Sequence, residues 1–411
     1  MFALPEPSAE FRLASALCRW PRTPAVLEAI RRAAAAVTDW PNCLKVVKRQ
    51  RIWGLAYEGL QAADVVAPSF VMQALAHQAR RIATQNLSMV AEAARLQAAF
   101  NAAEIDVIFL KGIVLAQQAY GTLSLKHGKD IDLWIIPSQI EMAWQCLERL
   151  GYRQDRLPQG YSPAMRQRYI RYKKEIGFLS SHTSGEVELH WRLSDTVNLF
   201  ETPWRENTSR ICIGGFSLRA LVKADLFCYL AQHGAMHAWY RLKWLADFNA
   251  VLAEKSLQDI DALYRQAVMR GAGLQAAYAL LLCREYLALP VDAALLAELQ
   301  QLWRVRTLCR LTDYLMCGDR LVDEPVASQS ARFAVICAWF IQCRSIRVFL
   351  RQGRVFWFSD ADMCDCPLPP RLFFLYPVLR LPLWVVRRVM QIAKRPHPVD
   401  EGAKMQIIKG L

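Results

Sequence analysis

The chain has 411 residues, of which 54% are hydrophobic and 21% are charged, and its formal net charge is +14. This composition is typical of a globular protein and excludes extensive disorder, and the length predicts two or three structural units. The positive charge favours polyanionic partners such as phosphates, nucleic acid or acidic lipid, although arginines that only solvate helix faces explain it equally well.

The N-terminal segment MFALPEPSAEF carries prolines and acids where a signal peptide needs a basic start and an apolar run, so we expect a cytoplasmic protein. The 12 cysteines are scattered, and in a reducing compartment we expect thiols and no disulfides. Cys364 and Cys366 are separated by one residue, which does not fit the common zinc knuckle.

Residues 1–100 predict an N-terminal helical region. Thr23 and Pro24 match an N-cap followed by proline in the first turn of a helix. Pro68 and Ser69 then begin a long helix that continues through Leu96.

Between residues 101 and 220 the hydrophobic period changes, which predicts a small β-sheet core. Residues 105–110 (IDVIFL) predict a strand, followed by a tight turn and a helix that ends at Gly121. Residues 130–136 (DIDLWII) predict a second strand, after which Ser138 is expected to cap a helix.

The same region predicts two hairpins. Residues 175–180 and 186–193 flank the polar segment SHTSG, and a shorter hairpin is expected around Gly214 and Gly215. The sheet is therefore expected to be complete by residue 220.

Residues 221–411 predict a C-terminal helical region, so the fold class is α+β, a small mixed sheet flanked by helical regions on both sides. Within it, residues 372–386 (LFFLYPVLRLPLWVV) are strongly apolar but too short for a membrane span, and they contain Arg380 and two prolines. We expect this segment to be buried. The alternative is an amphipathic segment that uses Arg387 and Arg388 in peripheral contact with a membrane.

Two carboxylates on one strand indicate a metal site. Asp130 and Asp132 point to the same face of their strand while Ile131 faces the core, and hard cations such as magnesium prefer such oxygen ligands. Glu188, between Val187 and Leu189, is the candidate third carboxylate, because a charge between hydrophobic residues needs a partner. Glu186, two residues earlier on the same face, is the competitor.

The turn Lys111-Gly112 lies between a predicted strand and a predicted helix. Glycine allows close approach of the backbone to a phosphate, the helix start offers free amides, and Lys111 adds a cation. The alternative is a lysine at an ordinary strand-end turn.

The order of strand, glycine-containing turn, helix, Asp-x-Asp strand and later carboxylate strand resembles the polymerase-beta-like nucleotidyltransferase superfamily. FLKGIVLAQQAYG, KDIDLWI, VELHWRL and QHGAMHAWYRLKWLADF, in this order, are similar to the uncharacterised nucleotidyltransferase family of bacteria. The similarity covers most of the chain, and the ordered set of four motifs is specific although no single motif is.

This resemblance implies that Asp130 and Asp132 are catalytic metal ligands and that Glu188 is the third acid. It also implies Mg²⁺ as the cofactor, with Mn²⁺ as an alternative, and a nucleoside triphosphate such as ATP as the substrate. Lys111 and Gly112 would then form the nucleotide-binding turn.

The chain departs from the family pattern in two places. The wider superfamily usually has Gly-Ser at the turn where this chain has Lys111 and Gly112. The family commonly has arginine four residues before the first aspartate, and Lys126 here keeps the charge without the bidentate fork.

Three histidines are candidates for substrate contacts. His190 shares a strand face with Glu188 and is expected either to orient it or to touch substrate, unless it is a structural histidine. His233 and His237 are four residues apart on a helix, a spacing that suits a zinc site, but a packing or substrate-lining role is the favoured interpretation.

We expect transfer of a nucleoside monophosphate from a nucleoside triphosphate to an unidentified hydroxyl or phosphate acceptor on a small molecule, peptide or protein. The alternative is a catalytically inactive nucleotidyltransferase fold that acts as a binding or scaffold module. Nucleic acid is a further possible partner, but the sequence contains no aromatic-basic motif of a known RNA-binding module.

Overall fold

The computed structural model describes residues 6–157, 161–181, 185–194, 207–317, 329–343, 345–357 and 359–393. The chain divides into two compact units. The first consists of Met1–Asp155 and Lys174–Gln352, and the second of Arg156–Lys173 and Gly353–Leu411. The division of the sequence into 1–100, 101–220 and 221–411 stays a prediction.

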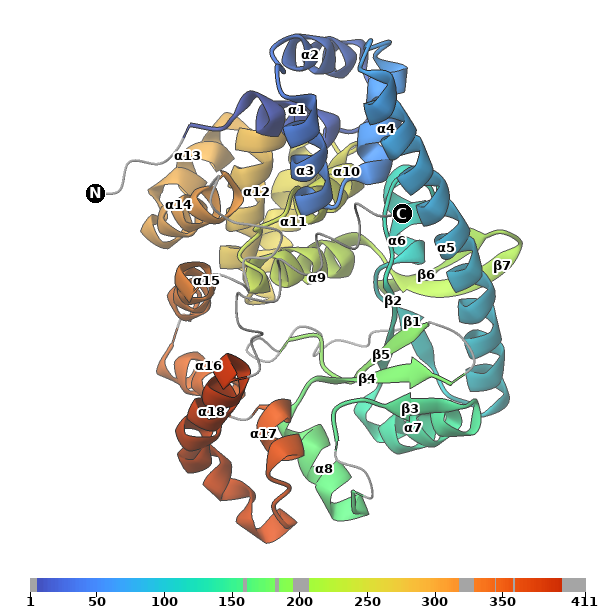
Figure 1. Cartoon of the computed structure of the whole chain (residues 1–411), viewed down its shortest axis with the longest axis vertical. Coiled ribbons are helices and arrows are strands. Elements are labelled where there is room, and N and C mark those ends of the chain that lie inside the picture. Colours follow the sequence, from blue (N-terminus) through green and yellow to red (C-terminus); the bar gives the residue numbers. More distant parts are fainter. Residues whose placement is uncertain are drawn as a thin grey trace, which may run out of the picture. The chain divides into compact units, whose positions relative to one another are not determined.

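The N-terminal part of the first unit is helical, as expected (Figure 1). The Thr23 side chain accepts a hydrogen bond from the Val26 amide, which confirms the predicted N-cap, and the long helix begins after Pro68. The helices are α1 (Ala9–Leu17), α2 (Pro24–Ala35), α3 (Trp40–Gln50), α4 (Trp53–Ala62) and α5 (Ser69–Ala102).

A single mixed sheet holds the seven strands of the described residues, in the order β3-β4-β5-β2-β1-β7-β6. They are β1 (Val107–Phe109), β2 (Asp130–Ile135), β3 (Tyr152–Gln154), β4 (Glu175–Ser180), β5 (Glu186–His190), β6 (Thr208–Ile213) and β7 (Phe216–Leu221). The central strand β2 is antiparallel to β1 and parallel to β5, so the expected α+β class is confirmed. The β2–β5 register pairs Asp132 with Glu188.

Most of the predicted connections are present, with one correction. The β4–β5 and β6–β7 hairpins form as expected, and Gly214 and Gly215 both have positive φ, as a tight hairpin turn requires. Residues 182–184 of the first hairpin lie outside the described residues. The prediction that Ser138 caps a helix is wrong, because Pro137 starts a 3₁₀ turn that contains Ser138, and the following helix has Gln139 at its N-cap.

The other helices of the first unit either connect strands of the sheet or follow the sheet in the chain. The connecting elements are α6 (Ile113–Tyr120), η1 (Pro137–Gln139) and α7 (Ile140–Arg149). The later helices are α9 (Lys223–Met236), α10 (Leu242–Leu252), α11 (Leu257–Met269), α12 (Gly273–Leu287), α13 (Ala293–Gln301), α14 (Trp303–Cys317) and α15 (Gln329–Ile341). The next helix, α16 (Ile346–Trp357), begins in the first unit and ends in the second. Trp239, in the corner between α9 and α10, is almost completely buried and packs edge to face against Phe248 of α10 and Tyr278 of α12, which holds this corner against both helices.

The second unit contains α8 (Pro163–Tyr172), α17 (Asp360–Asp365), η4 (Pro370–Leu375) and α18 (Tyr376–Ala393). The Asp362 side chain is fully buried and pairs with Arg380 at 2.9 Å and with Arg387. Arg387 also pairs with Asp365 at 2.6 Å. Arg380 and Arg387 of α18 therefore face its own unit.

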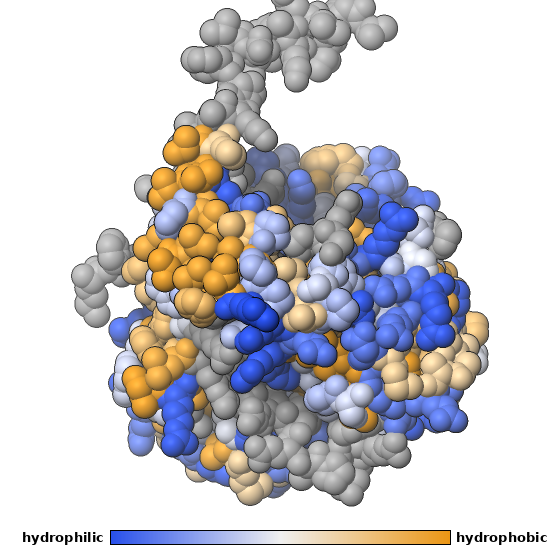
Figure 2. All heavy atoms as spheres, turned by 90° about the horizontal axis from the view of Figure 1, so that it is seen from below, coloured by the Kyte–Doolittle hydropathy of each residue, from blue (hydrophilic) through white to orange (hydrophobic). Residues whose placement is uncertain are grey.

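The apolar side chains of α18 face outward, so the expectation that this segment is buried is wrong for most of it. Val378 is 70% exposed, Leu381 61% and Trp384 51%, whereas Phe373 and Tyr376 are buried. Figure 2 shows an apolar patch over this part of the surface. In the part of the chain that the structure describes, no helix is long and apolar enough to cross a membrane.

Gly54 of α4 provides a test of how tightly the N-terminal helices press on the chain that leads into β2. A Cβ atom at Gly54 would lie 2.3 Å from the Ser124 carbonyl oxygen, so we expect Gly54→Ala to lower the free energy of unfolding by about 1–3 kcal/mol. Gly353→Ala is the control, since no atom lies within 4 Å of the added Cβ in α16. Equal denaturation midpoints for the two variants would contradict this packing.

Candidate active site

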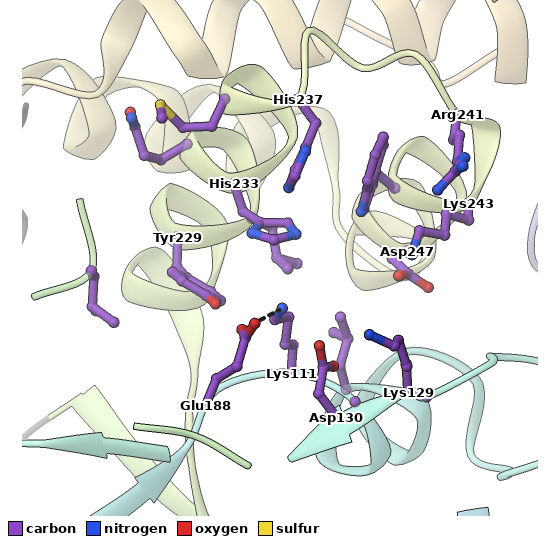
Figure 3. Close-up of a pocket in the computed structure, with 18 of the residues that line it drawn as sticks. Lys111, Lys129, Asp130, Glu188, Tyr229, His233, His237, Arg241, Lys243 and Asp247 are labelled. Carbon is purple, nitrogen blue, oxygen red and sulfur yellow. Dashed lines mark ion pairs between the residues drawn. The ribbon is translucent and has the colours of Figure 1, made fainter. Parts of the chain in front are cut away.

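A cavity of about 480 Å³ in the first unit gathers most of the residues singled out from the sequence. Figure 3 shows Lys111, Asp130 and Glu188 on one wall, with His233 and His237 of α9 on the opposite wall. The floor comes from the ends of the central strands, because the β1-α6 turn and the start of β2 meet there.

The predicted carboxylates lie on two neighbouring parallel strands. Asp132 on β2 is opposite Glu188 on β5, and ligand atoms of Asp132, Glu188 and His190 all lie within 4.8 Å of one another. Asp130 is half-buried and lines the same cavity as Glu188. Glu186 instead pairs with the exposed Lys129 at 2.8 Å. The structure thus brings Glu188, and not its competitor, next to Asp132.

Lys111 contacts the carboxylates. Its Nζ is 2.9 Å from Asp132 Oδ1 and 3.9 Å from Glu188 Oε2. Burial opposes the charged form of Lys111, but Asp132 and Asp130 outweigh burial and raise its pKa well above the ordinary value. Gly112 follows with φ +66° at the N-cap of α6, and an added Cβ would lie 3.3 Å from the Asp130 carbonyl oxygen. This turn therefore requires glycine.

His190 holds the carboxylates from the other side. Its Nε2 is 3.2 Å from Asp132 Oδ1 and 3.6 Å from Glu188 Oε2, and its Nδ1 is 2.9 Å from Glu175 Oε2. Burial opposes protonation, but Glu175 and Asp132 outweigh burial and raise the pKa of His190 to about 10. The imidazolium therefore donates from both ring nitrogens.

Glu175 was not singled out from the sequence. It lies on β4 directly opposite His190 on β5, so the predicted hairpin with its register would have revealed the pair. An acid that holds the second nitrogen of such a histidine fixes the orientation of the ring.

The acidity of the two central carboxyl groups is shifted in opposite directions. Burial raises the pKa of Asp132 to about 6 despite the nearby charge of Lys111. For Glu188 burial acts in the same sense, but the hydrogen bond from His190 and the charge of Lys111 lower its pKa to about 2. Both groups are therefore ionised at neutral pH.

The donor set fits a hard divalent cation. Asp132 Oδ2 is buried and accepts no hydrogen bond from the described residues, which is costly for a carboxylate oxygen. Oxygen donors of Asp132 and Glu188, with Asp130 at the mouth, match the preference of magnesium. His190 is engaged as a donor on both nitrogens, so it orients the carboxylates.

The loop before β2 is fixed by residues that the sequence did not reveal. Asn86 of α5 is buried, donates to the Leu123 and Lys126 carbonyl oxygens at 2.6 and 2.7 Å, and accepts from the Gly128 amide. Lys126 Nζ is 2.5 Å from Asp247 Oδ2 on α10. Asp247 belongs to the LADF segment of a recognised motif, whereas Asn86 carries no local signal because its role depends on the approach of a distant loop.

The predicted histidine pair lines the cavity. The His233 and His237 rings are 4.9 Å apart, and His237 stacks on Trp244 at 4.5 Å with an interplanar angle of 9°. Burial and the charge of Lys111 lower the pKa of His237 to about 3 and that of His233 well below its ordinary value. Both imidazoles are therefore neutral.

The corner after this pair has an unusual backbone. Ala238 and Trp239 both have positive φ, 47° and 50°, although neither is glycine. The Thr312 hydroxyl donates to the Ala238 carbonyl oxygen at 3.0 Å and supports the turn. Such backbone strain costs about 1–3 kcal/mol per residue and is typical of functional sites.

The neutral state of His237 predicts an acid-sensitive fold. A base whose pKa is lowered by folding contributes stability above its unfolded value of 6.5, and this stability is lost as the pH falls toward about 3. We expect His237→Phe, which keeps the stacking on Trp244, to lose less thermal stability than the parent between pH 6.5 and 4. Parallel melting temperatures across this range would show that His237 is not buried in its neutral form.

Comparisons with known proteins identify the family of this chain. A model of the family described as uncharacterised nucleotidyltransferase matches residues 36–288. A solution structure of the antibiotic-resistance factor ANT(2'')-Ia is similar with 14% identity and a TM-score of 0.34, covering 47% of this chain and 96% of that chain. A crystal structure of ANT(2'')-Ia in complex with adenylyl-2''-tobramycin has 13% identity and a TM-score of 0.33, with 46% and 99% covered. No curated protein matches. Since the family model covers more than half of its residues, the chain belongs to this family and is a nucleotidyltransferase.

Proposed function

We propose that this chain transfers a nucleoside monophosphate from a nucleoside triphosphate to a hydroxyl or phosphate acceptor, with Mg²⁺ or Mn²⁺ held by Asp132, Glu188 and Asp130. The observation that carries the proposal is the buried carboxylate of Asp132, which has one oxygen without a hydrogen-bond partner among the described residues and lies beside Glu188. When bound, the metal supplies Lewis-acid stabilisation of phosphoryl charge.

The side chains around the carboxylates have positioning roles in this proposal. Lys111 and His190 each contact Asp132 and Glu188, so they keep two acids close together that would otherwise repel each other. Pre-organised charge in an enclosed site is the main way in which proteins accelerate phosphoryl transfer.

The nucleotide and the acceptor are proposed to approach from different sides. The Gly112 turn and the first amides of α6 suit the phosphates, because a helix start attracts anions. The acceptor lies toward His190, His233 and His237, and the two neutral rings of the last pair offer it hydrogen bonds. The acceptor oxygen bonds to the α-phosphorus, the bond to pyrophosphate breaks, and the acceptor's proton passes to water.

The proposed acceptor is a small molecule, a peptide or a protein, and nucleic acid is not proposed because the sequence contains no aromatic-basic motif of a known RNA-binding module. The inactive binding module remains the second candidate, because the Lys111 ammonium contacts both acids that would hold the metal. An enzyme shows metal-dependent turnover, whereas a binding module holds the triphosphate without consuming it.

Asp132 and Glu188 provide the decisive variants. We expect Asp132→Asn and Glu188→Gln to lower turnover of labelled triphosphates, offered with Mg²⁺ and a cell extract, by about 100-fold or more, because several kcal/mol of charge stabilisation depend on the metal ligands. Glu186→Gln is the matched control on the same strand, since Glu186 pairs with Lys129, and we expect its activity to be retained. Full activity of folded Asp132→Asn, or equal losses in Glu186→Gln and Glu188→Gln, would refute this metal site.

We place this activity in the cytoplasm, where triphosphates and magnesium are available, with α18 in peripheral contact with an anionic membrane surface. The outward face of α18 is apolar and includes Trp384, a residue type that favours membrane interfaces. The chain's net charge of +14 complements acidic lipid.

Vesicle binding tests the role of α18. We expect the full chain to co-sediment with vesicles containing anionic lipid and Leu381→Asp to do so at least about fivefold less, because a charge would then enter the interface. Met142→Asp is the control, since Met142 is 47% exposed on α7 of the other unit. If the parent stays in the supernatant, or if both variants behave like it, α18 does not contact membranes.

A further inference from the structure

We infer that the α10 side of the cavity binds the β- and γ-phosphates of the triphosphate, with Lys243 as the principal cation and Lys126 beside it. This assignment rests on the proposed function and adds a role for Lys243, a residue of the fourth motif that the sequence analysis did not single out. With this assignment, the β- and γ-phosphates, here called the triphosphate tail, are bound by cations other than Lys111.

Lys243 has no carboxylate at ion-pair distance among the described residues. The acid beside it in the cavity wall is Asp247. Asp247 already binds Lys126 through Oδ2 and accepts from the Tyr120 hydroxyl through Oδ1 at 3.1 Å. Both oxygens of Asp247 are therefore engaged with other side chains.

The lowered pKa of Lys243 reflects its surroundings in the cavity wall. Burial, followed by the charges of Lys126 and Arg51, lowers its pKa to about 7 even though Asp247 acts in the opposite sense. Enclosing a cation beside other cations costs folding free energy, and a bound polyanion would offset that cost. Its Nζ lies 5.1 Å from the centre of the Trp244 ring, which holds the stem against α10.

The position of this cluster suits the tail and not the acceptor. In the sheet, β5 with Glu188 lies on one side of β2, and β1, which leads into α6, lies on the other. Figure 3 shows Lys243 and Asp247 on the side of Asp130, away from Glu188 and Tyr229. Lys126 lies four residues before Asp130, and α10 packs against α6. Phosphates that extend from the start of α6 toward α10 would thus leave the Glu188 side open for the acceptor.

This arrangement gives the cluster a role in the reaction. As the bond between the α-phosphorus and its bridging oxygen breaks, negative charge builds up on the departing pyrophosphate. Lys243 and Lys126 would stabilise that charge, while Lys111 stays with Asp132. The same contacts would retain pyrophosphate after transfer, so pyrophosphate is expected to inhibit in competition with the triphosphate.

Inorganic tripolyphosphate tests the subsite without requiring turnover. We expect Lys243→Met, which keeps the stem and removes the charge, to weaken calorimetric binding of tripolyphosphate with Mg²⁺ by about tenfold or more, and Lys243→Arg to restore most of it. Lys129→Met is the matched control, because Lys129 lines the same cavity but is 66% exposed and pairs with Glu186. Its effect should stay within about twofold.

Thermal unfolding provides a second measurement, and its expected result differs from that for a lysine with a purely structural role. Removing an uncompensated cation should raise the melting temperature of Lys243→Met without ligand and reduce the rise that tripolyphosphate causes in the parent. Unchanged tripolyphosphate affinity in folded Lys243→Met, or an equal loss in Lys129→Met, overturns the subsite.

The subsite and the proposed activity can fail separately. If the parent binds tripolyphosphate through Lys243 but never consumes a triphosphate, the subsite stands and the proposed catalysis fails. If the parent turns over a triphosphate and Lys243→Met has the same KM, the catalysis stands and the subsite fails.

Discussion

The burial of the Asp132 carboxylate is the constraint on which the rest of the site depends. A charge at the centre of a sheet is unstable unless opposite charges and hydrogen bonds accompany it, and Asp132 is almost fully enclosed. Lys111 from the end of β1 and His190 from β5 supply them, which is possible because β2 has these two strands as its neighbours. His190 in turn needs Glu175 across the β4–β5 hairpin. One buried acid therefore fixes side chains from the adjacent strands β2, β5 and β4 and from the turn after β1.

The cavity is divided into regions of different charge. On the Glu188 side, acids and cations lie within ion-pair distance of one another, whereas Lys243 on the α10 side has no carboxylate at such a distance among the described residues. The α9 wall carries two imidazoles that burial keeps neutral. A substrate that is anionic along part of its length and neutral elsewhere fits this division, and a nucleoside triphosphate has that character.

Much of this arrangement could be predicted from sequence, because it depends on local patterns. The Asp-Ile-Asp strand, the glycine turn and the two hairpins follow from residue period and turn chemistry, and their order carries the family resemblance. The direction of a long side chain does not follow from such patterns. Lys111 was expected at a phosphate site, but its flexible stem reaches the acids.

Contacts between residues that are far apart in the chain could not be predicted from local sequence patterns. Asn86 donates a hydrogen bond to a loop roughly forty residues away in the chain. Asp247, on a helix much later in the sequence, forms an ion pair with Lys126. An amphipathic helix usually buries its apolar face and exposes its charged face. In α18 the arrangement is the opposite, because ion pairs with the buried Asp362 hold Arg380 and Arg387 inward. Composition alone could not show which face a partner would cover.

The charge around Asp132 bears on the order of binding. Glu175 and Lys174 neutralise each other, which leaves the carboxylates of Asp130, Asp132 and Glu188 against the cations of Lys111 and His190. A divalent cation would convert this small negative excess into a positive one, and so would bind weakly by itself beside two existing cations. A triphosphate reverses the balance, because its phosphates bring more negative charge than the metal brings positive charge. In the proposed function, a metal that arrives together with the nucleotide would therefore bind better than the metal alone, and Lys243 and Lys126 would attract the same complex through its tail.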